Sequence, residues 1–154
     1  MTMIRSVTAN DRDAWLAMMD DFYHSEAVLH AIPRESMENT FRALTEGSPY
    51  AAGYVIERAG RSAGYALLSF TWSNEVGGKV VWIEELYLKP DFRGQGLGGE
   101  FFRWLHREFG DARRFRLEVS EENDDAARLY RRLGYTPLDY RQMVFDPADA
   151  DAAT

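Results

Sequence analysis

The sequence predicts one mixed α/β domain, and three observations indicate it. A chain of 154 residues that is 45% hydrophobic and 14% aromatic can bury one core but is short for two domains. The periodicity of its apolar residues changes along the chain in the order strand, two helices, three antiparallel strands, helix, strand, helix, strand. A strand-helix-strand unit at residues 80–119 favours two parallel neighbouring strands joined by a right-handed crossover. We expect the domain to occupy residues 1–145, followed by an acidic, flexible tail at residues 146–154.

The first third of the chain predicts a strand and two amphipathic helices. Residues 3–7 favour a short strand, and Thr8 with Asp11 three positions later indicates the start of a helix. A second helix is expected over residues 34–46, because its apolar residues share a face and Gly47 suits the position after a helix end. Both helices are expected to pack on a sheet.

The rest of the chain predicts the sheet and its second layer of helices. Strand-forming residues at 54–58, 62–72 and 80–88 are separated by turns and indicate three antiparallel strands. A helix after a glycine-rich loop then leads to a strand at residues 115–119, whose apolar residues alternate. After one more helix, residues 140–145 are expected to close the sheet as a last strand.

Composition excludes several functional classes. With 25 acidic and 18 basic side chains the net charge is −7, so we expect no nucleic-acid partner and no anionic membrane partner. No apolar run reaches the roughly 20 residues that span a bilayer. The absence of cysteine excludes disulfides and a thiol nucleophile, and with no leader-like N-terminus it favours the cytoplasm. The three histidines lack metal-ligand spacing, so no metal is expected.

The glycine-rich loop at residues 90–99 carries the strongest chemical signal. It lies between a strand and a helix, and glycines at alternate positions let the backbone amides of a helix start approach a phosphate group. Gly94 also begins a G-x-G-x-x-G pattern, with Glu118 placed like the acidic residue of a dinucleotide site. That alternative fails because the residues K-P-D-F-R separate the strand from the first glycine, and too little chain follows for a doubly wound sheet. A turn that merely packs the helix on the sheet is the plainer alternative.

Together with Arg93, this loop fills the pattern Q/R-x-x-G-x-G/A, which resembles the GNAT superfamily of acyl-CoA-dependent N-acetyltransferases. The segment IEELYLKPDFRGQGLG, with Asn123 seven residues before Tyr130, is most similar to the diamine and spermidine/spermine acetyltransferase branch. The resemblance implies the GNAT fold, an α/β (α+β) architecture. Its mixed, mostly antiparallel sheet of about six to seven strands is flanked by about four helices, and splayed parallel strands form the cleft for coenzyme A (CoA).

The resemblance also implies which residues bind acetyl-CoA as cosubstrate. Backbone amides of the glycine-rich loop would hold the pyrophosphate, amides of the preceding strand would pair with pantetheine, and Asn123 would lie along the pantetheine arm. The implied residues are Leu86, Tyr87, Leu88, Arg93, Gly94, Gln95, Gly96, Leu97, Gly98, Gly99, Asn123 and Tyr130.

Two adjacent carboxylates, Glu84 and Glu85, interrupt the alternation of the strand at residues 80–88. The apolar residues before the pair have one parity and those after it the other: Val81 and Ile83, then Leu86 and Leu88. This slip predicts a β-bulge that turns a carboxylate towards the cleft. An alkylamine with a pKa of about 10.4 must lose a proton before it attacks a thioester, so a base is needed. By analogy we expect Glu84 to be the base and Glu85 to anchor the substrate; two solvated carboxylates at a strand edge are the alternative.

Tyr130 is the candidate acid for the departing thiolate. It lies two turns after Asn123, so both residues face one extended ligand if the helix is regular. Periodicity alone would make Tyr130 a core residue, and the motif context reverses that preference. An acidic, aromatic group of residues at 20–30 would suit a cationic amine, although a solvated helix end explains it equally well.

The sequence therefore predicts an N-acetyltransferase that joins acetyl-CoA and a small primary amine in one ternary complex, without an acyl-enzyme. Two alternatives stay open: a non-catalytic acyl-CoA-binding sensor or partner subunit, and an enzyme that acetylates a protein N-terminus or lysine. A homodimer is expected from the resemblance.

Overall fold

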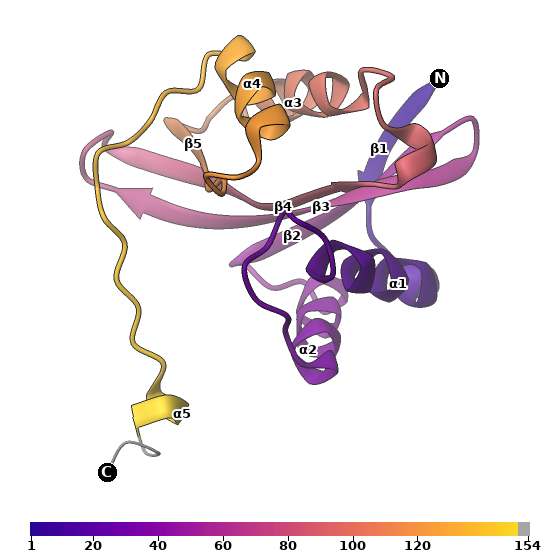
Figure 1. The fold of residues 1–154 in the computed structure, drawn as a ribbon, viewed down its shortest axis with the longest axis horizontal. Coiled ribbons are helices and arrows are strands. Elements are labelled where there is room, and N and C mark those ends of the chain that lie inside the picture. Colours follow the sequence, from indigo (N-terminus) through magenta and orange to yellow (C-terminus); the bar gives the residue numbers. More distant parts are fainter. Residues whose placement is uncertain (151–154) are drawn as a thin grey trace.

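The computed structural model describes residues 1–150, in which a five-stranded sheet separates two layers of helices (Figure 1). The strands are β1 (Thr2–Ser6), β2 (Ala51–Arg58), β3 (Arg61–Ser73), β4 (Gly78–Leu88) and β5 (Arg114–Leu117). The helices of the two layers are α1 (Arg12–Tyr23), α2 (Arg34–Thr45), α3 (Leu97–Glu108) and α4 (Asp124–Arg132). Short turns of helix form η1 (Ala9–Asp11), η2 (Pro90–Phe92) and α5 (Pro147–Ala150).

The strands lie in chain order across the sheet, β1-β2-β3-β4-β5. The first four are antiparallel to their neighbours, whereas β5 is parallel to β4 and is reached through α3. The pairing of β4 with β5 runs from Val80 opposite Arg114 to Ile83 opposite Leu117. This arrangement confirms the predicted crossover unit and the mostly antiparallel, mixed sheet.

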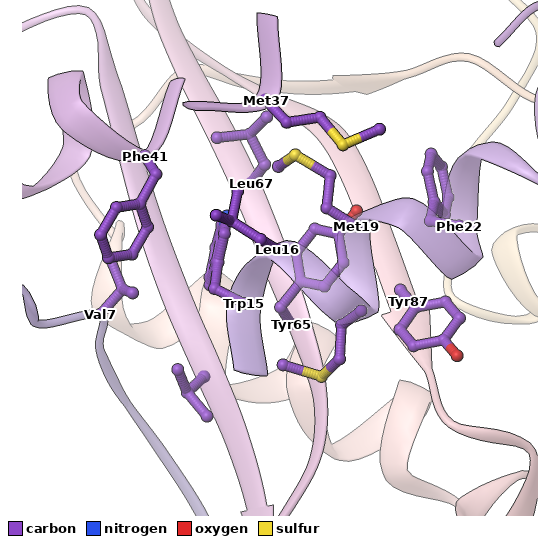
Figure 2. Packing of buried hydrophobic residues seen from close by; sticks show 12 residues of the cluster. Val7, Trp15, Leu16, Met19, Phe22, Met37, Phe41, Tyr65, Leu67 and Tyr87 are labelled. Atoms are coloured by element: carbon purple, nitrogen blue, oxygen red, sulfur yellow. The ribbon is translucent and has the colours of Figure 1, made fainter. Parts of the chain in front are cut away.

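Each face of the sheet carries its own core. The α1-face core lies under α1 and α2 and is centred on Trp15, Leu16 and Tyr65, all almost fully buried. Figure 2 shows Tyr65 in this core, where its ring contacts those of Phe22 and Tyr87. The α3-face core lies under α3 and α4 and is built around Phe101, Phe102 and Leu105. Burial of these two apolar sets is the main source of stability in the fold.

A β-bulge lies in β4 at the predicted place. Leu67 of β3 pairs with Glu85, and Leu68 pairs with Ile83, so Glu84 is an extra residue without a partner in the ladder. Because of this extra residue, the apolar side chains on both sides of it reach the same α3-face core: Val81 and Ile83 before it, Leu86 and Leu88 after it. The bulge thus places both carboxylates on the opposite face, towards α1.

The last strand predicted at residues 140–145 is wrong, and within residues 1–150 the sheet has five strands rather than six or seven. The segment is apolar enough for a strand, but it pairs with none: the Tyr140 hydroxyl donates to Glu75 Oε2 at 3.0 Å, beside the β3–β4 turn, and the chain then leaves the body (Figure 1). Met143, Val144 and Phe145 are 97%, 85% and 74% exposed. Strand propensity does not specify a pairing edge, which is why the sequence misled here.

The predicted tail begins with Asp146, and α5 forms within it. Residues 151–154 lie outside the described part of the chain. The flexibility of residues 146–154 therefore stays a prediction.

Candidate active site

A cleft opens where β4 and β5 separate. Their pairing ends at Ile83 and Leu117, but β4 continues to Leu88, so the backbone of residues 85–88 pairs only with β3 among residues 1–150. A cavity of about 500 Å³ lies at this point. It is lined from α1 by Tyr23, from β4 by Glu84, Glu85 and Leu86, from the end of β5 by Glu118, and from α4 by Asn123 and Tyr130. The segment between α1 and α2, residues 24–33, which we call the cover segment, closes one side.

Glu85 is a buried carboxylate, 8% exposed. Its Oε2 accepts a hydrogen bond of 2.5 Å from the Tyr23 hydroxyl, and its Oε1 accepts one of 2.7 Å from the Tyr65 hydroxyl. Burial raises the pKa of Glu85, a rise that these two hydrogen bonds oppose. Tyr23 belongs to the acidic, aromatic group found in the sequence, but Tyr65 was missed. Its place on β3, in phase with the buried Leu67, is the signal that could have indicated it.

Glu84 differs from its neighbour, since its side chain is exposed at the bulge. It lines the cavity and accepts a hydrogen bond of 2.6 Å from the Ser69 hydroxyl through Oε1, while its Oε2 has no hydrogen-bond partner among residues 1–150. Glu118, which the sequence offered only as part of a rejected dinucleotide pattern, is a third carboxylate of the cavity. None of the described residues that line the cavity is Lys or Arg. The cleft is therefore negatively charged and suits a cationic ligand.

Asn123 and Tyr130 reach the cleft from α4 as the spacing predicted. Asn123 caps the helix, because its Oδ1 accepts a hydrogen bond from the Ala126 amide at 3.3 Å. Tyr130 packs edge-on against Phe102, with ring centroids 5.6 Å apart, so it is both a core residue and a cleft residue. Burial raises the pKa of Tyr130, which keeps its hydroxyl protonated at neutral pH.

The glycine-rich loop forms a cradle of free amides at the start of α3. Gly94 and Gly96 have φ of +73° and +82°, a conformation that favours glycine. The first bond of α3 joins the Glu100 amide to the Gly96 carbonyl at 3.0 Å, and the amides of residues 94–99 meet no acceptor within residues 1–150. Such amides, with the helix dipole, suit a diphosphate. The Arg93 side chain instead donates to the Leu88 carbonyl at 2.9 Å.

The structure does not bring every predicted site residue to the cavity. Leu86 lines it, whereas the side chains of Tyr87 and Leu88 belong to the α1-face core and the α3-face core. The loop at residues 93–99 also lies outside the cavity, past the end of β4. The Gln95 side chain is turned back and donates to the Asp91 carbonyl at 2.9 Å.

Among residues 1–150 no group of three or more His, Asp or Glu side chains is arranged to hold a metal ion. No helix within these residues is both long and apolar enough to cross a membrane.

In this chain the two parallel strands of a mixed sheet separate beside a β-bulge, and the start of a nearby helix suits a diphosphate. Together these features define an acyltransferase that uses a CoA thioester. The profile of the Acetyltransferase (GNAT) family matches residues 14–135. The chain belongs to this family and is an acetyl-CoA-dependent N-acetyltransferase.

The chain is 33% identical over 144 residues to a Bacillus subtilis (strain 168) protein provisionally named ribosomal protein bS18-alanine N-acetyltransferase, covering 92% of this chain and 89% of that one. It is 36% identical over 77 residues to thialysine N-epsilon-acetyltransferase of Sus scrofa, covering 49% of this chain and 45% of that one. A solved structure of a possible acetyltransferase from Clostridium difficile 630 has the same fold, with a TM-score of 0.80 at 18% identity over 95% of this chain and 97% of that one.

Proposed function

We propose that this N-acetyltransferase acetylates a primary amine of a small molecule by direct attack within a ternary complex. One observation carries the proposal: the cleft at the parted strands gathers Glu84, Glu85 and Tyr130 around one cavity whose described lining holds no cation. A negative cleft raises the local concentration of a protonated amine, which is the form that a primary amine has in neutral water. The thialysine acetyltransferase relative, named for a small amine, supports this acceptor class.

In the mechanism we propose, a residue of β4 accepts a proton and a residue of α4 donates one. Glu84, through its open carboxylate oxygen or a water molecule, takes one proton from the ammonium group. The amine nitrogen then attacks the thioester carbonyl, and the carbon–sulfur bond breaks as the tetrahedral intermediate collapses. Tyr130 donates its proton to the departing sulfur and recovers one from the new amide nitrogen. The net products are the acetylamide, CoA and one proton. Glu85 stays an anion that attracts the acceptor.

We assign the binding of acetyl-CoA to backbone groups. The amides of residues 94–99 are the donors for the pyrophosphate. The amides of Leu86 and Leu88, which the antiparallel alternation directs away from β3, are the donors for pantetheine. One amide beside the bulge can also polarise the thioester carbonyl. Asn123 would face the pantetheine arm through its side-chain nitrogen, which meets no acceptor within residues 1–150.

The test is a free-thiol release assay with a panel of polyamines, amino acids, aminoglycosides and short peptides. Glu84→Gln and Tyr130→Phe should each lower kcat about 100-fold or more, since proton transfer contributes a factor of about 10² to 10⁴. CoA binding, measured by calorimetry, should stay within about twofold of the unsubstituted chain. Unchanged turnover in both variants would refute the assigned roles, and turnover of peptides alone would refute the small-molecule acceptor.

A second acceptor, the N-terminal amine of a protein, is favoured by one comparison. The Bacillus subtilis relative, which aligns over 92% of this chain, is named for alanine in a ribosomal protein. The cover segment argues against it, because its residues 27–30 line the cavity and leave less room for a peptide. The peptides of the panel decide between the two acceptors.

We also propose a cytoplasmic homodimer. The exposed apolar segment at residues 143–145 and the open outer edge of β5 are surfaces that a second copy could cover. Light scattering of the purified chain gives its mass in solution, and a monomer at all concentrations would refute the dimer.

A further inference from the structure

A small polar cluster joins three elements at the floor of the cleft. Tyr23 ends α1, Tyr65 lies in β3 and Glu85 follows the bulge of β4, and both tyrosine hydroxyls donate to the same carboxylate. Each oxygen of Glu85 therefore has its own donor. Two bonds in different directions fix the carboxylate plane, which a single bond would leave free to rotate.

The cluster contains no cation. Glu85 forms no ion pair within residues 1–150, and its stabilising partners are the two phenols. An ionised carboxylate in a buried place is costly unless hydrogen bonds replace the water that it loses. The titratable groups that act on it directly are Tyr23 from α1, Tyr65 from β3 and Glu84 from β4. His30 of the cover segment and Glu118 after β5 line the same cavity, and Asp21 of α1 accepts a hydrogen bond from Tyr87 of β4. The two phenols thus replace part of the water that the Glu85 carboxylate loses on burial and favour its charged form.

Tyr23 is also the residue that immediately precedes the cover segment. Val28 and Ile32 of that segment pack on the α1-face core, and Ala27 to His30 line the cavity. The bond from Tyr23 to Glu85 crosses from this end of α1 to β4. It links the last residue before the cover segment to the bulged strand. A second, longer hydrogen bond joins the same two elements: the Tyr87 hydroxyl of β4 donates to Asp21 of α1 at 3.3 Å.

We propose that Tyr23 and Tyr65 are positioning residues of the acceptor site: their hydroxyls hold Glu85 as a fixed anion facing the cleft, and Tyr23 also anchors the cover segment. This inference rests on the proposed function, because it assumes that the acceptor amine enters this cleft. The two tyrosines differ in what they control. Loss of the Tyr65 hydroxyl affects the carboxylate alone, whereas loss of the Tyr23 hydroxyl affects the carboxylate and the cover segment.

The experiment compares Tyr23→Phe and Tyr65→Phe with Tyr54→Phe as matched control. Tyr54 is a half-buried tyrosine that packs on Trp104 in the other core, and its hydroxyl makes no hydrogen bond within residues 1–150. Both site variants should raise the KM of the acceptor amine about tenfold, the effect of one lost bond to a charged group. The KM of acetyl-CoA should stay within about twofold, and the control should change neither constant.

Two further readouts separate positioning from a general loss of structure. Hydrogen bonds to the ionised form lower the pKa of a carboxyl group, so both variants should raise the pKa of Glu85 by about one unit. Carbon-13 NMR of labelled glutamate, with the Glu85 signal identified by Glu85→Gln, measures it without any substrate. Hydrogen exchange at the amides of residues 24–33 should become faster in Tyr23→Phe and not in Tyr65→Phe.

The outcomes distinguish this inference from the proposed function. An unchanged acceptor KM, or an unchanged pKa of Glu85, in a variant of an active chain overturns the positioning role. Equal hydrogen exchange in the two site variants overturns the anchoring role of Tyr23. If the unsubstituted chain turns over no amine of the panel, the proposed function fails and the acceptor site fails with it. In that case the titration still shows whether the tyrosines hold the carboxylate.

Discussion

Replacing Gly96 with alanine tests whether the backbone conformation of the glycine-rich loop holds the diphosphate of acetyl-CoA. Gly96 has φ of +82°, and a Cβ placed there meets no atom within 4 Å, so alanine adds no clash and only backbone strain. An L-residue in this conformation costs about 1–2 kcal/mol. A free loop can relax away from positive φ, but a loop that binds the diphosphate must return to it. We therefore expect the Kd of CoA to rise about 5- to 30-fold.

Calorimetric titration with CoA measures the effect, and Gly47→Ala is the matched control. Gly47 follows α2, has φ of +79° and also meets no atom within 4 Å, so it carries the same strain away from the loop. Its variant should melt a few degrees lower, at about 2–4 °C per kcal/mol for a chain of this size, and bind CoA normally. Equal CoA affinity in the two variants would refute the idea that the loop conformation forms the binding site.

Two further predictions concern stability. The Asp11 carboxylate accepts hydrogen bonds from Arg5, which lower its pKa from 3.8 to about 2, so its contribution is present above pH 4 and is lost as the pH falls to 2. In Asp11→Asn the melting temperature should therefore fall less between pH 4 and pH 2 than it does in the unsubstituted chain. An equal fall in both would contradict this account. In Gly64→Ala the new Cβ would lie 2.0 Å from the Tyr87 carbonyl oxygen of the adjacent strand, so β3 and β4 must separate. We expect a loss of about 3 kcal/mol or more in urea unfolding, and a loss below about 1 kcal/mol would mean that the strands tolerate the methyl group.

The elements that sequence predicted well are those with a local signal. The change of parity across Glu84 and Glu85 predicted the bulge, because strand alternation leaves no other way to bury the apolar residues on both sides of the pair. The glycines at positions 94 and 96 predicted a loop whose backbone a ligand can approach, and in the structure both have a positive φ that favours glycine. The seven-residue spacing of Asn123 and Tyr130 placed both on the cleft side of α4.

The features that sequence could not predict depend on contacts between distant segments. The hydrogen bond from Tyr65 to Glu85 joins residues 20 positions apart, and the one from Tyr23 joins residues 62 positions apart. Neither follows from periodicity. The strand expected at residues 140–145 failed for the same reason: its composition suited a strand, but the edge with which it would pair is a property of the whole sheet.

The separation of β4 and β5 leaves an opening in the sheet. The cavity at this opening is lined by α1 from one face of the sheet and by α4 from the other. Glu84 and Glu85 lie on the α1 side, and the amide cradle lies at the start of α3 on the far side. In the ternary complex proposed above, the amine and acetyl-CoA would therefore approach from opposite faces of the sheet, and neither would have to leave before the other enters.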